Sequence, residues 1–182
     1  GVGGALTDAS AETFYKLPKD KQKELLKAYY DVNNGIGYTL ARTNIQSCDF
    51  SSASYSYVSN IDKNLGSFSI AHDKKYRIPF IKEAISAAGG KLTLLASPWI
   101  PPAFMKDNHD VLHGGHLLPA YDQSWAHFYG KFIKAYQNVG LPVCGITIQN
   151  EHMAKQTWES CIYTEQEKPD LLKNNLGPTM QT

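Results

Sequence analysis

Residues 92–99 read LTLLASPW, a nearly continuous apolar run that ends in serine, proline and tryptophan. Such a run lacks the alternation of apolar and polar residues that a half-exposed strand shows, so it predicts a strand buried on both faces. Comparable runs at 2–6, 38–43 and 143–148 predict three further strands. Four strands of this kind indicate the α/β class, with a parallel sheet covered by helices.

Amphipathic helices are expected between the strands, because apolar residues recur at spacings of three and four. Thr7-Asp8 can cap the first helix, Asn34-Gly35 can end the second, and Asp122 can cap a helix with one aromatic face. A capping-box pattern begins the last helix, and Pro169 inside it is expected to displace its start. The helices are expected at 8–17, 18–34, 78–88, 122–139 and 164–176.

The repeated order of strand and helix leaves two architectures open, a (β/α)8 barrel and an open doubly wound sheet. A barrel needs about 250 residues, whereas the chain has 182. If the fold is a (β/α)8 TIM barrel, only about the first four βα units are therefore present. The length also favours one domain over residues 1–182, since a typical domain has roughly 150 residues.

Charge and composition exclude several classes of protein. Eighteen Lys and Arg against seventeen Asp and Glu leave a net charge of +1 without a basic block, so no nucleic-acid partner is expected. A hydrophobic share of 42% is too high for a disordered chain. No apolar run approaches the length of a membrane span, and the start of the chain does not read as a signal peptide.

In either architecture, functional side chains are expected beyond the carboxyl ends of the strands. Arg42 and Asp49 lie at the end of the second strand, Trp99 after the third, and Asn150-Glu151 after the fourth. Carboxylates and amides bind hydroxyl groups, and an indole can cover the C–H face of a sugar ring. Each residue alone has an ordinary structural explanation as a turn cap, packing anchor or loop residue. Their joint placement favours a neutral, polyhydroxylated ligand.

A cluster of histidines resembles a metal site in its spacing. His109, His113 and His116, together with Asp110, could supply zinc ligands, but their glycine-rich segment has no helix to fix the geometry. Solvated loop histidines are the better explanation, so no metal is expected. No phosphate-binding motif follows the glycines at 1–4, and no cofactor is expected.

Three cysteines are too few for a disulfide framework, because at most one pair can close. Cys144 is expected to be buried in the fourth strand as a small hydrophobic residue, without a disulfide to Cys48 or Cys161.

Several consecutive motifs resemble glycoside hydrolase family 30, most of all its glucosylceramidase (acid β-glucosidase) branch. The resemblance covers essentially the whole chain. It implies a partial family 30 catalytic barrel at 1–182, usually joined to a β-sandwich, and retaining hydrolysis of β-glucosides such as glucosylceramide. The motifs are GVGGALTDASAETF (1–14), IGYTLARTNIQSCDFS (36–51), LTLLASPWIPPAFMK (92–106), GITIQNE (145–151), KQTWESCIYT (155–164) and LGPT (176–179).

The resemblance also implies a role for each candidate residue. Glu151 matches the general acid/base, and Asn150 matches the neighbouring amide that binds the sugar 2-hydroxyl. Trp99 matches an aromatic wall of the glucose pocket, and Asp49 a carboxylate that holds hydroxyls on the far side of the ring. Arg42 matches a buried arginine that supports the catalytic carboxylates.

Two departures from the family are expected to matter. The family's nucleophile is a second glutamate after the seventh strand. Because only four strands are predicted here, we expect this glutamate to be missing from the chain. His152 stands where the family usually has proline, which stiffens the backbone. We therefore expect His152 either to loosen Glu151 or to act on it as a titrating neighbour.

Two hypotheses of different classes follow. The parent protein is a retaining β-glycosidase of glucosylceramide or another β-glucoside, with β-1,6-glucanase and xylanase as rivals within the family. The alternative is that the chain itself is a non-catalytic, sugar-binding half-domain. By resemblance, the full-length protein would be secreted, periplasmic or lysosomal.

Overall fold

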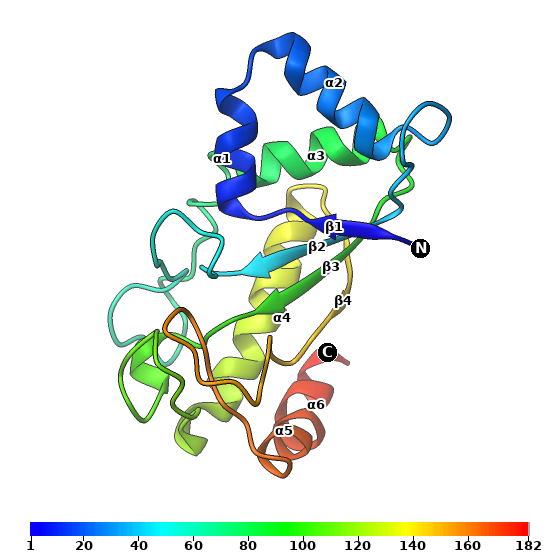
Figure 1. Ribbon diagram of the computed structural model, residues 1–182. Coiled ribbons are helices and arrows are strands. Elements are labelled where there is room, and N and C mark those ends of the chain that lie inside the picture. Colours follow the sequence, from blue (N-terminus) through cyan, green and yellow to red (C-terminus); the bar gives the residue numbers. More distant parts are fainter. Residues whose placement is uncertain (182) are drawn as a thin grey trace.

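Four parallel strands form one sheet in the computed structural model, which describes residues 1–181 (Figure 1). They are neighbours in chain order, and all three pairings are parallel, which confirms the predicted order and direction. The sheet is consistent with part of a (β/α)8 barrel. The strands are β1 (Gly3–Ala5), β2 (Leu40–Ile45), β3 (Thr93–Pro98) and β4 (Val143–Ile146).

The helices lie close to their predicted positions. Figure 1 shows α1, α2 and α3 packed together above the strands, with α4 passing behind the sheet. Within residues 1–181, no helix combines the length and apolar character that a membrane span requires. The helices are α1 (Asp8–Lys16), α2 (Lys19–Tyr30), α3 (Arg77–Ala87), α4 (Asp122–Asn138), α5 (Glu167–Leu171) and α6 (Gly177–Met180). The 3₁₀ turns η1 (Ala103–Met105) and η2 (Pro119–Tyr121) precede α4, and the π-helical segment η3 (Leu172–Leu176) joins α5 to α6.

The predicted start of α1 is confirmed, whereas α2 ends earlier than predicted. Thr7 is the N-cap of α1 and forms a capping box with Ser10. Helix α2 ends at Tyr30, earlier than the predicted Asn34-Gly35. The reason is Asp31, whose Oδ1 accepts the backbone N–H groups of Asn33 and Asn34 and so draws the chain into a turn.

Of the signals predicted for the later helices, the cap of α4 is absent and the capping box before α5 is present. Asp122 is the first residue of α4 and does not cap it, since the N-cap position is Tyr121 and carries no side-chain cap. The predicted capping box before α5 is present: Glu167 N–H donates to Thr164 Oγ1, and Thr164 N–H donates to Glu167 Oε2. Pro169 lies in the first turn of α5, where its missing N–H costs no helical hydrogen bond.

The aromatic face predicted for α4 forms much of the core. Trp125, Phe128, Phe132 and Tyr136 are fully buried. Tyr57, in the loop after β2, stacks on Phe128 and Phe132 with ring centroids 5.9 and 6.1 Å apart. This long loop is therefore anchored on α4, because burial of one such side chain contributes about 1.5–3 kcal/mol.

A buried ion-pair network joins the helices to that loop. Arg77, at the start of α3, is fully buried; its Nε lies 3.5 Å from Asp8 Oδ1, and its Nη2 contacts Asp73 Oδ2. The hydroxyls of Tyr57 and Tyr136 donate hydrogen bonds to the same Asp73 oxygen. One cation thus faces two buried carboxylates that belong to different parts of the chain.

Cys144 is exposed, so the prediction that it is buried was wrong. Leu94 and Leu95 of β3 pair with Val143 and Gly145, which leaves Cys144 as the extra residue of a bulge in β4. Its Sγ donates to Leu94 O at 3.1 Å. Cys144, Cys48 and Cys161 are free thiols, as predicted.

Replacing Arg77 by methionine is expected to destabilise the protein by about 3–5 kcal/mol, because two buried carboxylates lose their counter-charge. Urea unfolding of the full-length protein, followed by circular dichroism, measures the change. A loss below about 1 kcal/mol, the range of an exposed ion pair, would contradict a structural role for this network.

The same network predicts a pH dependence of stability. Burial opposes ionisation of Asp73, but the charge of Arg77 and the hydrogen bonds from its polar neighbours together outweigh burial, and the pKa of the carboxyl is lowered. Asp73 therefore contributes stability above the ordinary carboxyl pKa of about 3.9, and this contribution is lost as the pH falls through the lower folded-state pKa. Asp73→Asn should lower the stability at neutral pH and flatten its decline in acid. Urea midpoints at about pH 3, 5 and 7 measure both effects; a parallel decline in both proteins would contradict the assignment.

Candidate active site

The predicted site residues lie at one edge of the sheet. Arg42 is in β2 and Asp49 follows that strand, while Trp99 comes directly after β3. Asn150 and Glu151 follow β4. Because parallel neighbours present their carboxyl ends at the same edge, residues about 100 positions apart in the chain are brought into one region.

Arg42 connects three of these segments. Its Nε donates to Ser97 Oγ at 2.8 Å, and its Nη2 donates to Asn150 Oδ1 at 2.8 Å. The guanidinium carbon lies 4.7 Å from the centre of the Trp99 ring, which is the geometry of a cation–π contact. Burial lowers the pKa of Arg42 and the nearby Asp49 and Glu151 oppose this, but the guanidinium remains charged at any working pH.

The backbone at Asn150 and Glu151 is fixed against the end of β3. Asn150 N–H donates to Pro98 O at 2.9 Å, and the side chain of Gln149 donates to Trp99 O at 2.6 Å. Glu151 has a left-handed backbone with φ of +46°, which few glutamates adopt. Ala154 N–H donates to Glu151 O at 2.8 Å, so a tight turn begins at Glu151 and leaves its carboxylate exposed.

Trp99 and Asp49 form another part of this edge. Trp99 is only 8% exposed. Its indole Nε1–H lies near enough to Asp49 to act on that carboxyl, but it makes no hydrogen bond of good geometry within residues 1–181. Partial burial raises the pKa of Asp49, the carboxylates of Glu151 and Glu159 add to the rise, and the Trp99 indole opposes it. The pKa of Asp49 is thus influenced by both Trp99 and Glu151.

Sequence reasoning missed two residues of the loop after β4. Glu159 is buried and accepts a hydrogen bond from Ser54 Oγ at 2.7 Å. The side chain of Gln156 lies against Glu151, with Nε2 3.4 Å from Oε2. Neither residue belongs to a strand end or to a helical pattern, so only the folded course of the loop reveals them.

His152 does not contact the carboxylate of Glu151. Its ring nitrogens lie 3.5 and 3.3 Å from Lys168 Nζ, and its backbone oxygen accepts the N–H of Tyr163. The expectation that His152 acts on Glu151 as a titrating neighbour has no hydrogen bond or ion pair to support it within residues 1–181.

The loop histidines bind separate carboxylates. His113 Nδ1 lies 2.8 Å from Asp110 Oδ2, and His116 Nδ1 lies 3.2 Å from Glu167 Oε2. Elsewhere, Asp8, His72 and Asp73 lie close enough to suit a metal ion. Arg77 already contacts both of these carboxylates, so we assign this group to the ion-pair network.

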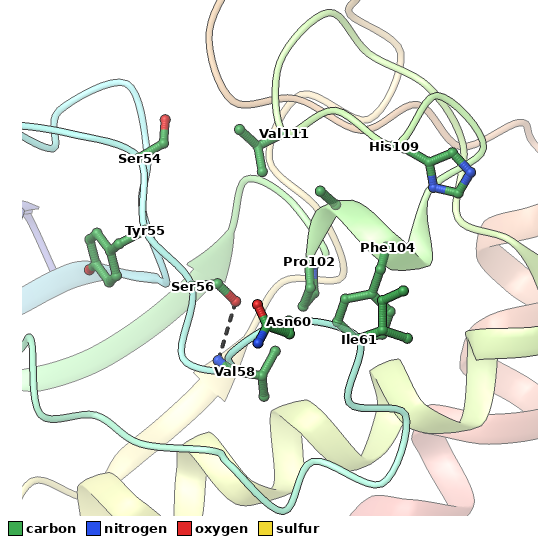
Figure 2. Close-up of a pocket in the computed structure, with 11 residues that line it drawn as sticks. Ser54, Tyr55, Ser56, Val58, Asn60, Ile61, Pro102, Phe104, His109 and Val111 are labelled. Carbon is green, nitrogen blue, oxygen red and sulfur yellow. Dashed lines mark hydrogen bonds between the residues drawn. The ribbon is translucent and has the colours of Figure 1, made fainter.

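A cavity of about 730 Å³ lies between the loops that follow β2 and β3 (Figure 2). Figure 2 shows Asn60 and Ile61 from the loop after β2, and Phe104 from the loop after β3, among the residues that line it. None of the predicted site residues lines this cavity, and its lining is mostly apolar. The candidate catalytic groups therefore lie outside it.

The edge of the sheet thus brings together an amide, an indole and two carboxylates. An exposed carboxylate stands beside an amide held by arginine, next to a buried indole whose N–H is free to donate. A second carboxylate completes the set. Hydroxyl groups can satisfy the amide, the indole and the second carboxylate, which leaves Glu151 available for proton transfer.

Comparison with known families agrees with this geometry. The glycosyl hydrolase family 30 TIM-barrel domain matches residues 1–182. The chain belongs to glycosyl hydrolase family 30. Members of this family are glycoside hydrolases, and the four parallel strands correspond to part of the family's barrel.

Family 30 relatives of known name resemble the whole chain. The chain is 34% identical to the lysosomal acid glucosylceramidase of Mus musculus, a match that covers 99% of this chain and 37% of that protein. It is 31% identical to an endo-1,6-beta-D-glucanase of Neurospora crassa, over 100% of this chain and 39% of the relative. The crystal structure of SrfJ from Salmonella typhimurium superimposes with a TM-score of 0.93 at 34% identity, over 98% of this chain and 40% of SrfJ. The chain therefore spans well under half of each relative.

Arg42→Met should reduce kcat/KM of the full-length protein by about 10- to 100-fold. Methionine keeps much of the side-chain volume, but it cannot donate to Asn150 or Ser97, and a charged hydrogen bond is worth about 1.5–3 kcal/mol. Hydrolysis of an aryl β-glucoside measures the effect, with the thermal midpoint as the control for folding. An unchanged kcat/KM would show that Asn150 does not need this arginine.

Proposed function

We propose that the full-length protein is a retaining β-glycosidase in which Glu151 is the general acid/base. The observation that carries this proposal is the Arg42–Asn150 hydrogen bond of 2.8 Å, which fixes the residue next to Glu151 at the carboxyl edge of the sheet. A positioned amide beside an exposed carboxylate suits a sugar that must present one glycosidic oxygen to one proton donor.

The neighbouring side chains would bind the sugar ring. Asn150 is oriented by Arg42 through its carbonyl oxygen, which leaves its amide group to donate to a hydroxyl. The unpaired Trp99 Nε1–H can donate to a second hydroxyl, and Asp49 can accept from others. A sugar would thus satisfy a buried donor that lacks a partner within residues 1–181, which supports binding at this place.

The proposed reaction needs a second carboxylate. In retaining glycosidases the two groups lie about 5–5.5 Å apart, and one attacks the anomeric carbon while the other protonates the leaving oxygen. We assign the attack to a glutamate in a later segment of the full-length protein, which also supplies the rest of the barrel. Glu151 would then deprotonate the water that hydrolyses the glycosyl-enzyme.

Glucosylceramide is the substrate that we propose first, because the chain is 34% identical to the mouse lysosomal acid glucosylceramidase. An endo-β-1,6-glucan is the second candidate, supported by 31% identity to the Neurospora enzyme. Comparing hydrolysis of glucosylceramide in detergent micelles with that of a linear β-1,6-glucan decides between them. No hydrolysis of either would contradict both assignments.

Glu151→Gln tests the proposed role directly. The variant keeps the shape of the side chain but cannot donate a proton, so hydrolysis of a glucoside with a poor leaving group should fall by about 10²–10⁴-fold. An activated aryl glucoside needs less protonation, so its glycosyl-enzyme should still form and then accumulate. Equal losses in this first step for both substrates would argue that Glu151 is structural.

The isolated 182-residue chain is expected to show no turnover, because we assign the nucleophile to a later segment. The aryl glucoside assay on the purified chain, with the full-length protein as the positive control, measures this. Turnover by the chain that Glu151→Gln does not affect would contradict the mechanism.

A further inference from the structure

The carboxylate of Glu151 has one hydrogen-bond partner within residues 1–181. Gln156 Nε2 donates to Glu151 Oε2 at 3.4 Å, across the turn that begins at Glu151. The distance is long, as is common for catalytic hydrogen bonds before a substrate is bound. An amide N–H can only donate, so this contact favours the ionised carboxylate over the protonated one.

Gln156 is held in place by the loop after β3. Its backbone oxygen accepts the N–H of His113 at 3.0 Å, and its own N–H donates to Ser160 Oγ at 3.3 Å. The same hydroxyl accepts the N–H of Gly114 at 2.9 Å. The backbone of Gln156 is therefore fixed on both sides, although its side chain is half-buried and reaches Glu151.

A buried lysine anchors this arrangement. Lys106 is fully buried, and its Nζ donates to Ser160 O at 2.9 Å and also to Asp110 O. Burial lowers the pKa of Lys106. The lysine thus joins the loop that carries Trp99 to the loop that carries Glu151, and Gln156 lies between this anchor and the carboxylate.

We propose that Gln156 is a positioning residue for Glu151, which it orients and stabilises in the ionised state. The inference rests on the proposed function. In the first step the nucleophile forms a bond to the anomeric carbon, the glycosidic C–O bond breaks, and the proton of Glu151 goes to the leaving oxygen. The negative charge left on Glu151 is then stabilised by the Gln156 amide until Glu151 takes a proton from the attacking water.

The consequence is a shift in the pH profile. Arg42 and Asp49 are charged groups whose own pKa values respond to Glu151, and a change at Gln156 removes neither charge. Removing the amide donor makes the carboxyl keep its proton to higher pH. The alkaline limb of kcat/KM, which reports loss of the general acid's proton, should therefore move upward.

The experiment compares the pH dependence of kcat/KM for the full-length wild type, Gln156→Met, Gln156→Glu and Thr157→Ala on a β-glucoside with a poor leaving group, whose first step needs the proton of Glu151. Methionine keeps the length of glutamine without its donor, so the alkaline limb should move up by about 0.5–1 pH unit. Gln156→Glu adds a like charge and should move it further. Thr157 is exposed and serves as the matched control, with an unchanged limb expected.

The thermal midpoint of each variant separates positioning from folding. An alkaline limb of kcat/KM that stays at the same pH in both Gln156 variants overturns the inference. A uniform loss of activity at every pH, together with a lower thermal midpoint, also overturns it. Glu151→Gln is run in parallel: if its loss does not depend on the leaving group, the proposed function itself has failed. If that dependence is present but the limb does not move, only the role of Gln156 is wrong.

Discussion

Because the four strands pair in parallel and in chain order, every loop that leaves a carboxyl end starts at the same edge of the sheet. Arg42 uses this arrangement, since a side chain of β2 reaches across the end of β3 to the segment that follows β4. A shift of β2 by one residue would turn that side chain to the other face. The geometry of the candidate site is therefore a direct consequence of strand register.

Aromatic packing with a buried ion pair stabilises one part of the molecule, and hydrogen bonds to backbone groups stabilise another. The helices and the loop after β2 are joined by aromatic packing and by Arg77, which is buried with its carboxylate partners. The loops at the carboxyl edge are joined by hydrogen bonds to backbone groups, as Lys106 and Ser160 show.

The sequence allowed the strands, their order and most helices to be predicted, because apolar periodicity reports burial over many residues at once. It also placed Arg42 and Asn150 at one edge, since parallel strands require this. Single positions were less predictable: Cys144 is exposed because one extra residue bulges from β4, and Asp31 ends α2 early by a local side-chain contact. Gln156 and Glu159 lay beyond prediction, because irregular loops carry no periodic signal.

The contact between Arg42 and Trp99 also has a spectroscopic consequence. The chain contains three tryptophans, and their surroundings differ: Trp125 is fully buried, Trp158 is 38% exposed, and Trp99 lies under a guanidinium. A cation over an indole changes the energy of its excited state, whereas an aqueous quencher such as iodide reaches an exposed ring first. Emission from Trp99 should therefore respond to a sugar that enters beside Arg42, while quenching by iodide would report on Trp158. The fluorescence of Trp99 can therefore be used to follow ligand binding at the edge of the sheet.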